Sequence, residues 1–479
     1  MYIRVQTPLK PTYLVYFILL LACCISCSDT NEKKPAPNFI IIFTDDQGYG
    51  DLGCFGHPTI KTPNLDQVAA EGQKWTQFYV AAPVCTPSRA ALMTGRYPAR
   101  NGMTSAKRVV LFPNSAGGLP QSEITIAEVL KQENYATGIV GKWHLGHLPS
   151  YLPTRQGFDY FYGVPYSNDM NALGNMPSYW DNSHDPYYQA RTDQFDVPLL
   201  ENLEVIERPV DQTTITRRYT EKAVEFIKTN KDRPFFLYLA HSMPHIPLFA
   251  HKDFEKSSKQ GLYGDVIREI DWSVGQVLRT LYQLGLENNT IVVFSSDNGP
   301  WLAYKSHGGS AGPLRGGKGT TFEGGQRVPT IFWGPGYIKP GVVDELGSTL
   351  DLIHTFASFS NTKIPGERKM DGYDLSPVLQ GVAAESPRST FFYWSRAELH
   401  AVRSGRWKLY LKQHHPINYG KESISLEKPE LYDLQADISE RYDLSAQHPG
   451  IADSLRRLME HHKASFADSL PDHLAARIE

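Results

Sequence analysis

The sequence is poor in cysteine, nearly balanced in charge and without an apolar run long enough to cross a membrane. Five cysteines occur in 479 residues, and three of them crowd into residues 23–27, which excludes a disulfide-rich scaffold. The 48 Lys+Arg and 51 Asp+Glu leave a formal net charge of −3, so no overall field attracts nucleic acid or an anionic membrane. Stability must come from a hydrophobic core. Any anion site must be built from local positive charge.

The apolar run from Tyr13 to Ile25 is too short for a bilayer but typical of a secretion signal. Cys23, Cys24 and Cys27 at its end resemble the lipobox at which bacterial lipoproteins are cut and acylated. We predict a signal in residues 1–27 and a polar tether in residues 28–37. The protein is then exported to a bacterial periplasm or anchored to the outer membrane, with an N-terminal lipid as its only membrane contact. An ordinary signal peptide with incidental cysteines is the alternative.

Short apolar runs alternate with helical patterns through most of the chain. Residues 38–44 form an Ile-rich run of the kind found in a buried central strand, and residues 62–75 predict a helix with Thr62 as its cap. Further helices are expected at residues 88–95, 125–135, 219–230, 264–286 and 450–470, and further strands at 136–141, 234–240 and 290–296. The alternation predicts an α/β fold: a large, mostly parallel mixed sheet flanked by helices.

The pattern changes near residue 380 to short strand-like pieces, one of them at residues 400–411. We therefore predict a catalytic domain over residues 38–380 and a smaller C-terminal α+β subdomain, built on a short antiparallel sheet, over residues 381–479. Residues 160–209 have little periodicity and predict irregular loops at the rim of a site. Their aromatic residues could either stack on a sugar ring or pack the loops.

Polar side chains follow the predicted strands at the edge where α/β sheets bind ligands. The carboxylate and amide group comprises Asp45, Asp46, Asp297 and Asn298. These oxygen ligands suit a hard cation such as Ca²⁺ or Mg²⁺ better than zinc. The cationic or potentially cationic group comprises Arg89, Lys142, His144, His241 and Lys318. Each residue alone has an ordinary loop role, but together they predict a metal site for an oxyanion ester.

Cys85 lies just before a predicted helix, with Pro87 near the helix's first position. A helix N-terminus favours an anion or lowers a thiol pKa. Cys85 could be a buried structural residue, half of a disulfide with Cys54, a thiolate nucleophile or a chemically modified residue. A thiolate that accepts a sulfate or phosphate group has no easy release step, which favours modification. Cys54 is expected to be a small buried hydrophobe.

The motifs around these residues resemble the signatures of the sulfatase family. "CTPSR" with "LMTGR" matches the signature in which cysteine becomes formylglycine, and "GKWHLG" matches a second one. "DDQGYGDLG", "SSDNGP" and "GGKGTTFEGGQRVP" are similar to blocks in its arylsulfatase A and N-acetylgalactosamine-6-sulfatase group. The resemblance extends from Asn38 into the C-terminal region and implies an alkaline-phosphatase-like sulfatase fold.

The resemblance also implies roles for the polar residues. Asp45, Asp46, Asp297 and Asn298 correspond to calcium ligands, and Cys85 to the formylglycine that a maturation enzyme generates. Arg89 and Lys142 correspond to the pair that holds the formylglycine, and His144 to the base that deprotonates its second hydroxyl. His241 and Lys318 correspond to contacts of the sulfate and the leaving oxygen. His245 either points into the same pocket and binds substrate or packs its own loop.

The predicted activity is hydrolysis of a sulfate ester, on galactose or N-acetylgalactosamine of a sulfated glycan. A hydrated aldehyde offers two hydroxyls on one carbon, so one can attack sulfur and the other can lose a proton to release sulfate. The first alternative is a phosphoester or phosphonate hydrolase of the same superfamily. The second is a noncatalytic lipoprotein that binds sulfated glycan and keeps Cys85 as a thiol. No nucleic-acid partner is expected.

Overall fold

The computed structural model describes residues 1–3, 36–173, 179–415, 423–466 and 469–478. The predicted signal and its three cysteines therefore lie outside the described residues, apart from residues 1–3, as does nearly all of the predicted tether. Contacts divide the chain into Met1–Pro35 and Ala36–Glu479, and the second unit is described below. No helix in the described part of the chain is both long and apolar enough to span a membrane.

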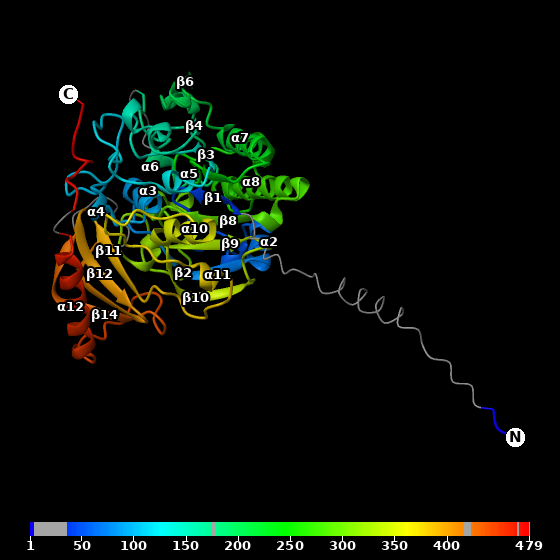
Figure 1. Ribbon diagram of the computed structural model, residues 1–479. Helices are drawn as coiled ribbons and strands as arrows, with labels where there is room; N and C mark the ends of the chain where they lie inside the picture. Colours follow the sequence, from blue (N-terminus) through cyan, green and yellow to red (C-terminus); the bar gives the residue numbers. More distant parts are fainter. Residues whose placement is uncertain (4–35, 174–178, 416–422, 467–468, 479) are drawn as a thin grey trace. The chain divides into compact units, whose positions relative to one another are not determined.

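A ten-stranded sheet organises the second unit, with the strand order β10-β2-β9-β8-β1-β7-β3-β4-β5-β6 (Figure 1). The strands are β1 (Asn38–Thr44), β2 (Gln73–Tyr79), β3 (Ala136–Gly141), β4 (Tyr160–Gly163), β5 (Leu199–Glu201), β6 (Glu204–Glu207), β7 (Phe235–Ala240), β8 (Thr290–Ser296), β9 (Arg327–Trp333) and β10 (Gly341–Ser348). The central strand β1 is buried throughout and pairs in parallel with β7 and β8. The predicted mostly parallel mixed sheet is confirmed.

Helices cover both faces of this sheet. Successive residues of β1 point to opposite sides, and because all of them are buried, each face of the strand packs against helices. Ile40 and Ile42 belong to one apolar cluster with α2 (Pro63–Glu71), α7 (Ile215–Thr229) and α8 (Gly261–Leu284). Phe39, Ile41 and Phe43 belong to the opposite cluster. The helices of that second cluster are α3 (Cys85–Thr94), α5 (Ile126–Lys131), α10 (Leu352–Ser360) and α11 (Ser376–Leu379). Shorter helices are α4 (Pro98–Asn101), α6 (Tyr179–Asn182) and α9 (Glu323–Gln326).

The predicted helix over residues 62–75 is wrong at its end. Helix α2 begins at Pro63, as expected, but stops at Glu71, and Trp75 lies in strand β2. Gly72 ends the helix in an extended conformation, packed so closely that a Cβ atom would lie 2.1 Å from the Phe332 carbonyl oxygen. The helical pattern continued past Gly72 because Trp75, fully buried in the sheet core, reads as one more apolar position.

The C-terminal region forms a four-stranded antiparallel sheet packed against one helix, as predicted. Its strands are β11 (Thr390–Ser395), β12 (Glu398–Ser404), β13 (Trp407–Gln413) and β14 (Ile424–Asp433), and its helix is α12 (Pro449–Ala464). The single strand-like piece expected at residues 400–411 is instead two strands, β12 and β13. Gly405 adopts a positive φ of 54° between them, which lets the chain reverse.

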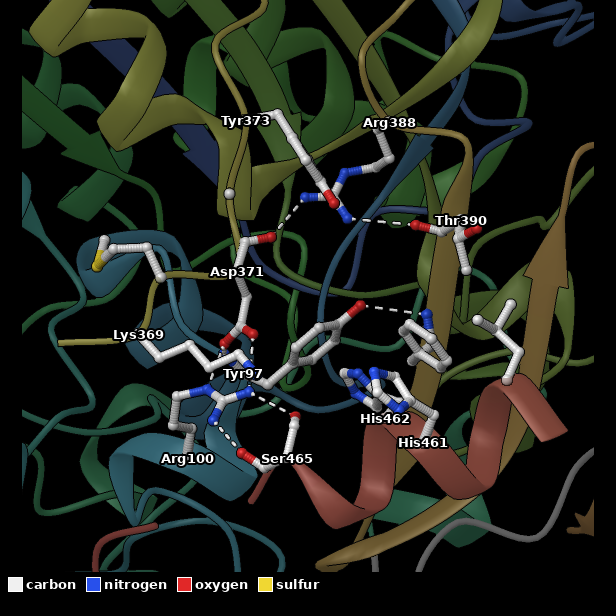
Figure 2. Close-up of a pocket in the computed structure, with 14 residues that line it drawn as sticks. Tyr97, Arg100, Lys369, Asp371, Tyr373, Arg388, Thr390, His461, His462 and Ser465 are labelled. Carbon is white, nitrogen blue, oxygen red and sulfur yellow. Dashed lines mark hydrogen bonds and ion pairs between the residues drawn. The ribbon is translucent and has the colours of Figure 1, made fainter. Parts of the chain in front are cut away.

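Ion pairs and a cavity of about 360 Å³ lie where the C-terminal region meets α4 (Figure 2). Arg100 contacts Asp371 at 2.9 Å and also donates to the Ser465 carbonyl oxygen just after α12. Arg388 is paired with the buried Asp351. These ion pairs and hydrogen bonds join the C-terminal region to the large domain. Because Arg100 and Arg388 are already paired with carboxylates, they have little capacity to bind a ligand.

Candidate active site

Most of the predicted polar residues follow four neighbouring strands of the sheet. Asp45 and Asp46 follow β1, Asp297 and Asn298 follow β8, Lys142 and His144 follow β3, and His241 follows β7. Because β8, β1, β7 and β3 are adjacent and parallel, these residues meet at one edge. All seven are at least 97% buried. Charges removed this far from water must neutralise one another or bind an ion.

Cys85 is the first residue of α3, a helix whose ten residues are all buried. Its Sγ atom lies 3.4 Å from Asp45 Oδ1 and 4.0 Å from Asp46 Oδ1. Burial and the charges of Asp297 and Asp45 raise the pKa of Cys85 well above its usual value. The thiol is therefore protonated at neutral pH, which argues against a thiolate nucleophile. Cys54 and Cys85 are both free, so the disulfide alternative is wrong, and Cys54 is partly exposed.

Three cations face the buried carboxylates. Arg89 Nε donates to Asp297 Oδ2 at 2.9 Å. Lys142 Nζ lies 2.5 Å from Asp45 Oδ2, and Lys318 Nζ lies 2.7 Å from Asp46 Oδ2. Burial alone would raise the pKa of Asp45, but Lys142, Arg89 and Lys318 hold it below its usual value. The cluster thus contains a fixed positive charge beside each carboxylate.

Two of the four predicted metal ligands, Asp45 and Asp46, lie in a buried group of side chains that could hold a cation, and Asp297 and Asn298 lie beside it. Ligand atoms of Asp45, Asp46, Cys85 and His245 all lie within 4.8 Å of one another. Asn298 Nδ2 donates to Asp46 Oδ1 at 2.8 Å. The other amide atom, Asn298 Oδ1, is buried and has no hydrogen-bond partner among the described residues. Burial, Asp45 and Asp297 raise the pKa of Asp46 to about 7 despite Lys318. A divalent cation would bind Asn298 Oδ1 and relieve the repulsion of Asp46 by Asp45 and Asp297.

The histidines of the site are buried and uncharged. His144 Nε2 lies 2.9 Å from the Leu111 carbonyl oxygen, and His241 Nε2 lies 3.2 Å from Ser273 Oγ. In the described part of the chain neither Nδ1 has a hydrogen-bond partner. Burial lowers the pKa of His241 to about 3, and burial and Lys142 lower that of His144 well below its usual value. A neutral imidazole with a free ring nitrogen can exchange a proton with a bound ligand.

His245 faces the carboxylates as well as its own loop. Its Nε2 lies 3.5 Å from Asp46 Oδ2, and its Nδ1 lies 2.5 Å from the Ile246 carbonyl oxygen. The ring is also within 3.4 Å of Ser167 Oγ. Of the two alternatives left by the sequence, these contacts favour a place in the site.

Sequence reasoning missed three side chains that hold the cations. The Tyr238 hydroxyl accepts from Arg89 Nη1 at 3.3 Å, and Ser167 Oγ accepts from Lys142 Nζ at 3.2 Å. The Trp301 ring centroid lies 4.1 Å from Lys318 Nζ. Ser167 lies in the segment expected to form loops around the site, which is a weak signal. Tyr238 is an aromatic residue inside a buried strand, where core packing is the default interpretation.

Comparison with known proteins agrees with this geometry. The Sulfatase family model matches residues 37–361, and a model for the C-terminal region of aryl-sulfatase matches residues 386–475. The chain is 42% identical to arylsulfatase A of Homo sapiens, covering 88% of this chain and 87% of the relative. It is 38% identical to N-acetylgalactosamine-6-sulfatase of Mus musculus, covering 95% and 91%. A solved Bacteroides thetaiotaomicron structure, described with the metabolism of multiple glycosaminoglycans, is 30% identical, covers 89% and 99%, and superposes with a TM-score of 0.77.

The fold, the buried group of carboxylates and cations, and these comparisons together define a hydrolase of the sulfatase class. This chain belongs to the sulfatase family and is a sulfuric ester hydrolase.

Proposed function

We propose that the protein hydrolyses a sulfate ester of galactose or N-acetylgalactosamine in a sulfated glycan, with Ca²⁺ and a formylglycine derived from Cys85. The observation that carries this proposal is the position of Cys85. It begins a fully buried helix, 3.4 Å from Asp45, with a thiol pKa raised well above its usual value. A protonated thiol there is a poor nucleophile, whereas the family's modified residue would suit the position. A maturation enzyme is the partner that would convert it.

The metal would be held by Asp45, Asp46, Asp297 and Asn298. When bound, Ca²⁺ supplies positive charge that polarises oxygen atoms at position 85 and on the sulfate. The family's modification at position 85 supplies a hydrated aldehyde as the nucleophile. The unpartnered Asn298 Oδ1 supports the metal assignment, because a buried amide oxygen without a donor costs free energy unless it binds something.

The cations and histidines divide the remaining work. Arg89 and Lys142 hold the residue at position 85 and neutralise charge beside it, supported by their contacts with Asp297 and Asp45. His144 accepts a proton through its free ring nitrogen. Lys318, His241 and His245 contact the sulfate and the leaving oxygen.

The glycan, the location and the domain boundaries are part of the proposal. Two relatives support the glycan: one is named N-acetylgalactosamine-6-sulfatase, and another is described with glycosaminoglycan metabolism. The signal in residues 1–27 and the tether in residues 28–37 would deliver the enzyme to a bacterial periplasm or to the outer membrane as a lipoprotein. The catalytic domain would span residues 38–380 and the C-terminal subdomain residues 381–479.

A desulfation screen across defined sulfated mono- and disaccharides tests the substrate. The same alcohol is offered as its sulfate and as its phosphate, and the phosphate alternative wins if the phosphate is turned over faster. Mass analysis of the peptide containing residue 85, from the native host, tests the modification. We expect a peptide lighter than the cysteine form that reacts with a hydrazide. An unmodified Cys85 in an active enzyme would contradict the mechanism.

Asp297→Ala tests the metal site. This substitution removes one ligand, so activity should be lost while the circular dichroism spectrum stays folded. A variant that turns over substrate like the wild type without calcium would refute the assignment. The noncatalytic alternative predicts glycan binding with no turnover in any maturation-competent host.

A further inference from the structure

Two adjacent cavities beside α3 are lined by cations and by no described acidic residue. The larger has a volume of about 610 Å³, and its lining includes Lys107, Arg108, Arg396 and Arg477. The smaller shares Arg108 and Arg396 with it. We call these four side chains and the hollow between them the basic groove.

The basic groove adjoins the segments that carry Cys85 and Lys318. The smaller cavity is lined by Val84, which precedes Cys85, and by Gly319, which follows Lys318. The Gly319 N–H donates to the Pro83 carbonyl oxygen at 2.8 Å, which fastens the two segments together. A ligand in the groove would therefore lie next to the backbone of both site residues.

The loop that carries Lys107 and Arg108 is also tied to the site. The Leu111 N–H donates to Thr86 Oγ1 at 3.1 Å, and the Leu111 carbonyl oxygen lies 2.9 Å from His144 Nε2. Leu111 is three positions after Arg108 in the chain, so their Cα atoms are at most about 11 Å apart. The groove's positive charge is thus fixed near the reacting centre.

Three of the groove's cations, Lys107, Arg108 and Arg477, have no ion-pair partner among the described residues. Within the described ranges, the hydrogen-bond acceptors of Arg108 are two neutral oxygens, Ser115 Oγ at 3.0 Å and Asn114 Oδ1 at 2.6 Å. Partial burial and the neighbouring Arg477 lower its pKa. Lys107 and Arg477 have exposed side chains and make no salt bridge in the described part of the chain. The cavity of Figure 2 differs, because its Arg100 is already bound to Asp371.

We propose that the basic groove is a subsite for a second anionic group on the glycan whose sulfate ester is being hydrolysed. The substrate would then be a chain of sugars with a sulfate or carboxylate near the scissile one, and not an isolated monosulfated sugar. This inference rests on the proposed function. The cations Lys107, Arg108 and Arg477, whose cavities have no described acidic lining residue, attract a polyanion and lose that attraction as salt screens them.

The test measures, by calorimetry on the full chain, the affinity for a multiply sulfated galacto-tetrasaccharide and for monosulfated galactose. Turnover of 4-nitrophenyl sulfate, a small substrate, shows separately whether the catalytic residues are intact. The double variant Lys107→Gln with Arg477→Gln removes two exposed charges. Arg108→Gln is a separate variant that retains hydrogen-bonding capacity. The matched control is Lys228→Gln with Lys231→Gln, two exposed lysines on and just after α7.

We expect the tetrasaccharide to bind wild type at least about tenfold tighter than the monosaccharide at low salt. The Lys107/Arg477 variant should lose about fivefold of that affinity, with the loss shrinking at high salt, while the control and 4-nitrophenyl sulfate turnover stay unchanged. Equal binding of the two sugars, or a groove variant that binds like wild type, would overturn the proposal. Charge-dependent binding without any sulfate turnover would instead refute the proposed function and leave the groove standing.

Discussion

Replacing Lys408 by methionine should destabilise the protein by about 3–5 kcal/mol at pH 7, because it leaves buried carboxylates without their cation. Lys408 Nζ lies 2.8 Å from Glu323 Oε1 and 2.9 Å from Glu440 Oε1, and all three side chains are fully buried. It also donates to the Thr321 carbonyl oxygen at 3.0 Å. Methionine keeps the apolar stem, so the loss comes from electrostatics and hydrogen bonding and not from a cavity.

The loss should depend on pH in a defined direction. Burial would raise the pKa of Glu323, but Lys408, Arg403 and Arg327 hold it below its ordinary value of 4.5. A lowered pKa contributes stability above pH 4.5 that is lost as the pH falls. Without Lys408 the pKa of Glu323 rises, and protonation of its carboxylate relieves its repulsion with Glu440. The difference between wild type and variant should therefore shrink between pH 7 and pH 5.

Urea unfolding followed by tryptophan fluorescence measures both effects. Lys412→Met is the matched control on the same strand, because its ion pair with Glu398 is partly exposed and should be worth at most about 1 kcal/mol. Adding Glu440→Gln to the Lys408→Met variant should recover part of the loss. A loss below about 1 kcal/mol, or one independent of pH, would refute the reasoning.

Three further outcomes test the site. Chelation with EGTA should abolish turnover and lower the melting temperature, and calcium at about 100 times its Kd should restore about 2.7 kcal/mol; equal melting curves with and without calcium would contradict a structural metal. Gly299→Ala places a Cβ atom 1.7 Å from the Gly324 carbonyl oxygen and should cost about 1–3 kcal/mol in urea unfolding, whereas Gly341→Ala, with nothing within 4 Å, should not. Trp301→Leu removes the ring 4.1 Å from Lys318 Nζ and should lower kcat/KM by an amount equivalent to about 0.5–2 kcal/mol of activation free energy. An unchanged kcat/KM would show that the ring does not position the lysine.

The central part of the fold could be predicted because its sequence patterns are local. Continuous apolar runs such as residues 38–44 identify parallel strands buried on both faces, and the polar residues that follow them must then share one edge of the sheet. Asp45 and Asp297 could be assigned to one site on that argument alone. Strand β2 escaped prediction because its partners β9 and β10 lie far along the chain, and its own pattern continues that of the preceding helix.

The contacts that hold the site could not be predicted, since they join residues far apart in sequence with no motif between them. Lys408 and Glu323 are separated by 85 positions, and Arg89 reaches the Tyr238 hydroxyl across 149. Each of these residues alone has an ordinary interpretation: a surface lysine in a strand, a helix-end glutamate, a core tyrosine. Only the fold shows that Lys408 is fully buried and binds two carboxylates.

The position of Lys408 makes the C-terminal sheet part of the active site's support. Glu323 lies five residues after Lys318, and besides Lys408 it accepts hydrogen bonds from the Tyr393 and Tyr79 hydroxyls at 2.7 and 2.5 Å. Lys408 and Tyr393 belong to the C-terminal sheet, whereas Tyr79 belongs to the large one. The loop that brings Lys318 to Asp46 is therefore fixed from both sheets through a single carboxylate. A change in the C-terminal region should for this reason alter turnover as well as stability, although no described residue of that region forms a hydrogen bond or ion pair with the proposed metal ligands Asp45, Asp46, Asp297 and Asn298.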